Sequence, residues 1–201
     1  MSFDTSRMLE QPSLTDSGAA PKPTDSLFFA IFPDEPAARR IAQLALHLRG
    51  EHGLKGNPPA MERFHVTLHH LGSYAGLPPG VVARASDAAA TGTTPPFDVA
   101  FDRAGSMSGR RGKRPFVLRG GDGVAALRAF QQSLGTAIQQ VGLVGRARSH
   151  YTPHVTLLYD GRYVAEQAVE TVGWAVHELV LVHSLLGRSQ YVPLARWPLM
   201  P

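Results

Sequence analysis

Two short segments of the sequence carry the same four residues, His-Val-Thr-Leu. They begin at His65 and at His154, 89 residues apart, and the eight-residue stretches that start there agree at five of eight positions. Imidazole titrates near neutral pH, so one ring of a pair can accept a proton while the other donates one. The hydroxyls of Thr67 and Thr156 could bind the non-bridging oxygens of a phosphate. The four side chains together suit cleavage of a phosphodiester without a metal.

A β-strand explains why His and Thr stand two residues apart in each motif. Side chains alternate between the faces of a strand, so His65 and Thr67 share one face while Val66 and Leu68 point into the core. The β-branched Val and Thr favour a strand over a helix. By the same alternation His69 could line the site beside Thr67, or could be a surface histidine at the end of the strand.

Each motif also has a plainer interpretation. A single His-Val-Thr-Leu is a common sequence, and a lone strand histidine is more often packed or solvent-exposed than catalytic. His65 and His69 stand four residues apart, as in helical zinc sites. The residues between them favour a strand, however, and no acidic partner follows the zinc pattern. We therefore expect neither a metal nor a cofactor.

The order of the predicted elements indicates an α+β fold with largely antiparallel strands. Strands are expected at Leu27–Phe32, Phe64–Leu71, Phe97–Phe101, Phe116–Leu118, His154–Tyr159 and His177–Leu186, with a last extended piece at Tyr191–Leu194. Helices are expected after Asp34, at Val81–Ala90 and at Ala125–Val141. A loop rich in Gly and Arg is expected over Gly105–Arg114. Two similar halves, each with one motif, would bring both motifs to a shared cleft.

Composition narrows the class of protein further. The chain has 201 residues, 43% of them hydrophobic and 18% charged, which is typical of a globular protein. It has no Cys, no apolar run long enough to span a membrane and no secretory signal, so a soluble cytoplasmic protein is expected. Residues 1–25 are expected to form a disordered tail and residues 26–201 one two-lobed domain. The net charge of +4 is compatible with a polyanionic partner.

The paired motifs resemble those of the 2H phosphoesterase superfamily, and most closely its RNA 2′,3′-cyclic phosphodiesterases, often labelled 2′-5′ RNA ligases. The segment Leu27–Pro33 is similar to the first strand of that family, and Pro153 precedes the second motif as it does there. The segment Leu179–Leu186, with Tyr191 and Trp197–Leu199, is similar to the closing segment of the family. The resemblance covers residues 27–199.

This resemblance implies two pseudo-symmetric lobes whose antiparallel sheets flank a central cleft, with helices outside. It implies hydrolysis of an RNA 2′,3′-cyclic phosphate to a 2′-phosphate, with 2′-5′ ligation as the reverse reaction. His65 would be the acid and His154 the base, although exchanging the two roles uses the same groups. Thr67 and Thr156 would bind the phosphate. The expected partner is RNA or a nucleotide with a cyclic phosphate, which only a 2′-hydroxyl can close, and the protein is expected to be a monomer.

One position departs from the family pattern. Many relatives carry an Arg after the second motif, where this chain has Tyr159. Arg148, Arg110 and Arg111 are the candidates to supply that positive charge. Tyr151, just before the second motif, could stack on a base or could simply pack in the fold.

Two further functions remain open at this point. One is an enzyme that acts on a small cyclic or 2′-5′-linked nucleotide. The other is a non-catalytic module of the same fold that binds RNA or a nucleotide. The presence of both histidines favours an enzyme over a binding module.

Overall fold

The computed structural model describes residues 21–110, 112–143 and 151–200. In chain order the strands of this part are β1 (Asp25–Ile31), β2 (Val66–Tyr74), β3 (Phe97–Ser106), β4 (Arg114–Arg119), β5 (His154–Asp160), β6 (Gln167–Val176), β7 (Glu178–Leu185) and β8 (Gln190–Pro198). They form one sheet in the order β6-β3-β4-β5-β2-β1-β7-β8, and every neighbouring pair is antiparallel. The helices are α1 (Glu35–Glu51), α2 (Pro79–Ala90) and α3 (Ala125–Gln140), with short 3-10 turns η1 (Met61–Arg63) and η2 (Asp122–Val124). The expected α+β class with antiparallel pairing is confirmed.

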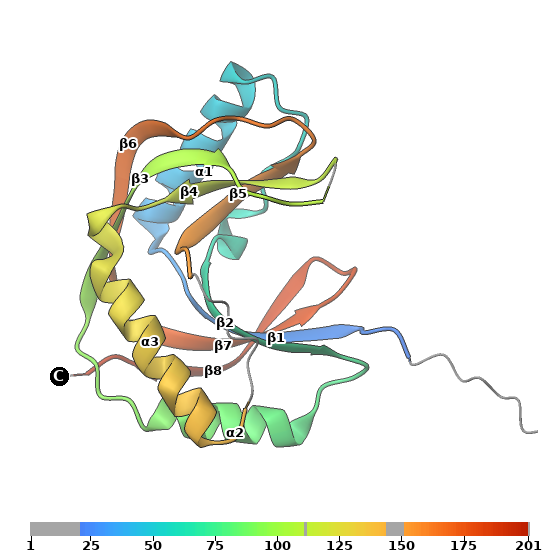
Figure 1. Cartoon of the computed structure of the whole chain (residues 1–201), viewed down its shortest axis with the longest axis vertical. Helices are drawn as coiled ribbons and strands as arrows, with labels where there is room; N and C mark the ends of the chain where they lie inside the picture. The colour runs from blue at the N-terminus through green and yellow to red at the C-terminus, as the bar shows by residue number, and fades with distance from the viewer. Residues whose placement is uncertain (1–20, 111, 144–150, 201) are drawn as a thin grey trace, which may run out of the picture.

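The sheet consists of two four-stranded halves that meet at a single residue pair. Strands β6, β3, β4 and β5 form the upper half in Figure 1, and β2, β1, β7 and β8 form the lower half. The halves are joined where Val66 of β2 pairs with Val155 of β5. This narrow junction lets the two halves diverge, as the two lobes in Figure 1 show.

The repeat seen in the two motifs extends to the elements around them. Strand β4 begins 89 residues after β1, and α3 begins 90 residues after α1. Each motif strand therefore completes a strand–helix–strand unit, β1-α1-β2 in one case and β4-α3-β5 in the other. The two units place their second strands next to each other at the centre of the sheet.

The helices of the repeat units reach across the boundary between the two halves of the sheet. Helix α1 begins after Asp34, whose side chain accepts a hydrogen bond from the Ala37 N–H at 2.8 Å, which satisfies a free amide of the first turn. Its apolar stripe, with Ile41 and Leu48, packs on β5 and β6. Helix α3 contacts β2 and β3, and α2 contacts β7 and β8. Helix α1 of the first unit thus packs on the upper half, and α3 contacts one strand of each half, so both helices connect the halves beyond the single strand pair.

Strand β1 is buried on both faces, which explains its unbroken apolar run. Leu27, Phe29 and Ile31 lie in the main core under the helices. Phe28 and Ala30 face the other way and form a second cluster with Val180 and Val182, against which Phe32 and Tyr191 pack. An apolar surface therefore also lies on the side of the lower half-sheet that the main core does not occupy.

Several element boundaries differ from the sequence-based predictions. Strand β6 was not predicted, because its first half, Gln167–Thr171, is polar and largely exposed and so lacks a clear period of two. Strand β3 runs on to Ser106 through Gly105, which was assigned to a loop; a Cβ at Gly105 would lie 2.8 Å from Glu166 Cα, so the neighbouring backbone requires glycine there. The predicted tail boundary at residue 25 is too late, because Asp25 is buried and begins β1. Residues 1–20 of that tail lie outside the described residues.

None of the helices described here is long and apolar enough to cross a membrane.

Candidate active site

The two motif strands lie side by side at the centre of the sheet. Because Val66 and Val155 are antiparallel partners, continuing the register puts His65 beside Thr156 and Thr67 beside His154. The four aliphatic residues of the motifs are buried, whereas both histidines and both threonines are partly exposed. The alternation predicted from the sequence is therefore confirmed, and the motifs are related by a local two-fold axis through the valine pair.

Both imidazoles are held in the same way by their own backbone. Nδ1 of His65 lies 2.8 Å from the Arg63 carbonyl oxygen, and Nδ1 of His154 lies 2.8 Å from the Thr152 carbonyl oxygen. A carbonyl can only accept, so Nδ1 carries a hydrogen and donates it in each ring. Nε2 is therefore the atom of each histidine that is left to exchange protons with a substrate.

His65 is packed among aromatic rings. Its ring centroid lies 5.2 Å from Phe28, 5.9 Å from Phe32 and 5.3 Å from Tyr191. This burial lowers the pKa of His65 to about 4. The positive charges of His154 and Arg63 lower the pKa further, whereas the hydrogen bond to the Arg63 carbonyl raises it. The ring is neutral at pH 7, and its Nε2 accepts a hydrogen bond from the Thr67 hydroxyl at 3.1 Å.

Two arginines that the sequence analysis did not select lie next to the motifs. The guanidinium of Arg63 is 4.6 Å from the centre of the Tyr191 ring. Arg119 of β4 is the strand partner of His154 and forms an ion pair with Glu166. The Nε of Arg63 and the Nε of Arg119 are both buried and have no hydrogen-bond partner within the described part of the chain.

The missed arginines had partial signals in the sequence. Arg63 stands two residues before His65, so its closeness to the first motif is visible in the sequence. Arg119 could be recognised only from the register of β4 on β5, which the sequence does not contain. Of the cations proposed instead, Arg148 and Arg111 lie outside the described residues, and Arg110 lies in the exposed turn between β3 and β4.

The other predicted site residues are engaged within the protein. His69 Nε2 donates to the Gln131 carbonyl oxygen at 2.8 Å, which holds the ring against α3, and burial lowers its pKa. The Tyr151 hydroxyl donates to the Thr67 carbonyl oxygen at 3.2 Å, and burial raises the pKa of its phenol. Tyr151 thus braces the backbone of the first motif. Substrate binding by His69 and by Tyr151 stays a prediction.

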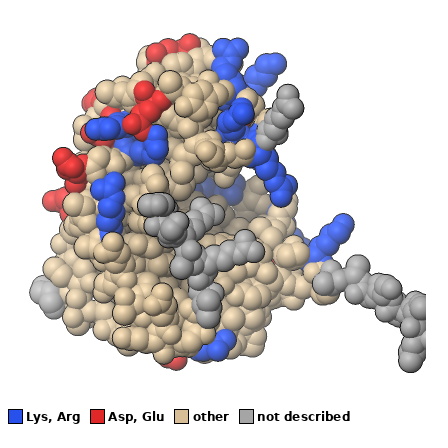
Figure 2. All heavy atoms as spheres, viewed as in Figure 1, with Lys and Arg blue, Asp and Glu red and all other residues tan. Residues whose placement is uncertain are grey.

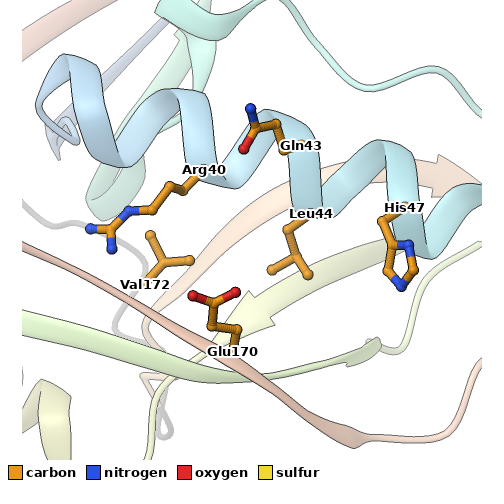
Figure 3. Close-up of a pocket in the computed structure, with 6 residues that line it drawn as sticks. All are labelled: Arg40, Gln43, Leu44, His47, Glu170 and Val172. Atoms are coloured by element: carbon orange, nitrogen blue, oxygen red, sulfur yellow. The ribbon is translucent and has the colours of Figure 1, made fainter.

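Figure 2 shows the surface hollowed between the two halves, to the right of centre. Two other pockets lie away from the motifs. A pocket of about 220 Å³ between α1 and β6 is drawn in Figure 3, where Leu44 of α1 lies above Glu170 of β6 and Arg40 extends to one side. A groove of about 360 Å³ lies between α2, α3 and β8. Neither contains a motif residue.

The chemistry available at the junction is acid–base chemistry with hydroxyl and guanidinium donors. Across residues 21–110, 112–143 and 151–200, no group of three or more His, Asp or Glu side chains is placed to hold a metal ion. The residues present are two imidazoles, two hydroxyls and two adjoining arginines, a set that suits an anionic substrate with transferable protons.

Comparison with known proteins agrees with this arrangement. A solved structure described as a phosphoesterase is 28% identical, with a TM-score of 0.68, and the match covers 88% of this chain and 99% of the other. E. coli LigT in complex with 3′-AMP is also 28% identical, with a TM-score of 0.66 and coverage of 90% and 100%. TT0787 of Thermus thermophilus shares the fold at 22% identity, with a TM-score of 0.63 and coverage of 87% and 97%.

No curated protein sequence matches the chain. The model of one protein family, however, matches residues 32–188, which include both motifs and the strands that carry them. This match agrees with the paired histidine motifs and with their meeting at one strand junction. The chain belongs to the 2′-5′ RNA ligase superfamily.

Proposed function

We propose that the protein is a metal-independent phosphodiesterase that hydrolyses RNA 2′,3′-cyclic phosphate ends to 2′-phosphates. The observation that carries the proposal is the antiparallel pairing of the two motifs, with His65 and His154 on either side of the Val66–Val155 pair. The family membership and the nucleotide bound to E. coli LigT support a nucleotide substrate. RNA is the natural source of such an end, because closing the ring requires a 2′-hydroxyl.

In the proposed reaction, a water molecule attacks phosphorus and the bond from phosphorus to the 3′ oxygen breaks. Nε2 of one histidine takes the proton of the attacking water, and Nε2–H of the other gives a proton to the departing 3′ oxygen. The products are a 2′-phosphate and a 3′-hydroxyl. Because Nδ1–H of each ring is held by a backbone carbonyl, proton transfer in each ring is assigned to Nε2.

Charge on the phosphate is stabilised by the neighbouring donors. The hydroxyls of Thr67 and Thr156 are partly exposed beside the histidines and can donate to the non-bridging oxygens. Arg63 adds a positive charge on the side of His65, and Arg119 adds one on the side of His154. These two guanidinium groups take the place of the Arg that relatives carry at the position of Tyr159.

The assignment of acid and base depends on how phosphate changes His65. In the free protein His65 is neutral, since its pKa lies near 4. The acid role that the family resemblance implies requires the bound phosphate to raise this pKa, as a neighbouring negative charge does. Exchanging the two roles leaves the overall reaction unchanged.

The test is a turnover assay in EDTA with a nucleoside 2′,3′-cyclic phosphate and a short RNA that ends in one. Products are separated as 2′- and 3′-phosphates. We expect 2′-phosphate from the wild-type protein and a loss of about 10²- to 10⁴-fold in both His65→Ala and His154→Ala. His47→Ala is the control, because His47 is exposed on α1.

Other outcomes separate the competing functions. Turnover only of the mononucleotide or of a 2′-5′-linked dinucleotide would move the assignment to a small nucleotide substrate. Binding without turnover by the folded wild-type protein would contradict catalysis and leave a binding module.

A further inference from the structure

Strand β5 leads from the second motif to an exposed tyrosine on the same face. Thr156 pairs with Val117 and Leu158 pairs with Phe116, so Leu157 is an extra residue in a bulge. Leu157 and Leu158 are both buried, and the alternation resumes after them with Tyr159 on the face of Thr156. At about 3.3 Å per residue, Tyr159 lies roughly 10 Å from Thr156 along the strand.

The surroundings of Tyr159 combine exposed aromatic rings with positive charge. Tyr159 is 50% exposed, and the Lys113 ammonium lies 5.5 Å from the centre of its ring. Tyr163, just after β5, is 64% exposed. We call the group the β5-end patch; its members are Arg110, Lys113, Arg114, Tyr159, Arg162 and Tyr163. Figure 2 shows Lys and Arg side chains gathered at the upper right, around the tip of β4 and β5, and acidic side chains on the opposite side.

The cations of this patch are not neutralised by carboxylates. None of its four basic residues takes part in an ion pair among the residues that the structure describes. Arg114 and Arg162 instead donate to the backbone carbonyls of Gly161 and His52. Asp160, which follows Tyr159, accepts from the backbone N–H groups of Arg162, Gly56 and Lys55, and these hydrogen bonds hold its pKa below the usual value.

We propose that the β5-end patch binds the single-stranded RNA that adjoins the reacting end. This inference rests on the proposed function and assigns a binding surface to the part of the RNA chain that precedes the cyclic phosphate. Exposed aromatic rings stack on unpaired bases, and nearby Lys and Arg bind the phosphate backbone. Because Tyr159 shares a face with Thr156, a strand whose terminal phosphate lies at the motifs can continue onto the patch.

The first test compares kcat/KM for a 2′,3′-cyclic mononucleotide with kcat/KM for an RNA octamer that ends in the same group. The wild-type protein is expected to favour the octamer. Tyr159→Ala is expected to raise KM for the octamer by about ten-fold and to leave the mononucleotide unchanged, because it removes a stacked base. Tyr159→Phe keeps the ring and is the matched control, with the octamer preference retained. Equal values for both substrates in the wild-type protein, or an octamer preference unaffected by Tyr159→Ala, would overturn the proposal.

A second measurement does not depend on catalysis. Binding of a fluorescent RNA octamer with a plain 3′-hydroxyl is followed by anisotropy at several salt concentrations. Lys113→Gln is expected to weaken binding and to lower the slope of log K against log salt by about 0.7, the value for one phosphate contact on a single strand. Arg84→Gln is the control, because Arg84 is also an exposed basic residue but lies on α2.

The two tests separate the two proposals. RNA binding that depends on Tyr159 and Lys113, without turnover of any substrate, would sink the proposed hydrolysis and keep the RNA surface. Turnover of both substrates with no effect of either variant on RNA binding would keep the hydrolase and remove the surface. Loss of binding to anionic phosphatidylserine vesicles in these variants, with RNA binding unchanged, would reassign the patch to a membrane and overturn the inference.

Discussion

Val66 of β2 faces Val155 of β5, and this one pair joins the two halves of the sheet. Each valine is fully buried and stands between the His and the Thr of its motif. The relative position of His65 and His154 therefore depends on how these two side chains pack. A change at this pair should affect catalysis more than an equal change elsewhere in the core.

We predict that Val66→Ala lowers kcat/KM by more than its effect on stability explains. Removing two buried methyl groups should cost about 1–3 kcal/mol of unfolding free energy. Val172→Ala in β6 is the matched control, because Val172 is also buried but lies far from β2 in the sheet. Urea unfolding and turnover are measured for both. Equal losses of kcat/KM at equal losses of stability would contradict a special role for the junction.

The sequence was sufficient to predict the motif strands and the faces of their side chains. Those features depend on a local period of two and on β-branched residues, which Val66, Thr67 and their counterparts carry. The helices after Asp34 and at Ala125 were predictable for the same kind of reason, since their apolar stripes advance by three or four residues.

What the sequence could not supply was the register between strands. The position of Arg119 beside His154, and that of Tyr159 on the same face as Thr156, follow from the pairing of β4 with β5 and from the bulge at Leu157. Such pairings join residues that are tens of positions apart, so no local pattern in the sequence indicates them. His69 shows the converse case, because its parity was read correctly but its ring is held by Gln131 of α3, a contact between distant segments.

The depressed pKa of His65 makes stability depend on pH. Its pKa is about 4 when folded and about 6.5 when unfolded, so between these values the unfolded chain binds more protons. Stability should therefore fall as pH falls from 6.5 to 4, by at most about 3 kcal/mol from this group, and by less because the ring is partly exposed. We predict that His65→Gln loses less stability than the wild-type protein over this window, measured by urea unfolding at pH 7 and pH 5. An identical pH dependence in the two proteins would contradict the burial of a neutral His65.

The threonine hydroxyls are predicted to act on the phosphate and not on folding. Thr67→Val and Thr156→Val keep the shape of the side chain and remove the hydroxyl donor. Each should lower kcat by about 10²-fold, the usual cost of losing one preorganised donor, with little change in Tm. Thr67→Ser and Thr156→Ser retain the donor and should retain most of the activity. If the Val and Ser variants are equally active, the hydroxyls do not bind the phosphate.

Arg63 links the charge of the site to the protonation of His65. Its positive charge is one of the causes that lower the pKa of His65, so removing it should raise that pKa. It should also weaken binding of the negatively charged phosphate, because a charge-assisted donor is lost. We predict that Arg63→Met, which keeps the aliphatic stem, raises the His65 pKa and lowers kcat/KM by about ten-fold.

The His65 pKa can be read from the imidazole signals in an NMR titration, with and without inorganic phosphate. In the wild-type protein, phosphate should raise this pKa, and the rise should be smaller in Arg63→Met because the anion binds less tightly. Arg63→Lys separates charge from shape, since an ammonium keeps the charge but loses the planar contact with Tyr191. Arg84→Met, remote on α2, should leave both the titration and the kinetics unchanged. An unaltered His65 titration in Arg63→Met would show that the Arg63 charge does not lower the His65 pKa, and would remove Arg63 from the proposed phosphate site if kcat/KM were also unaltered.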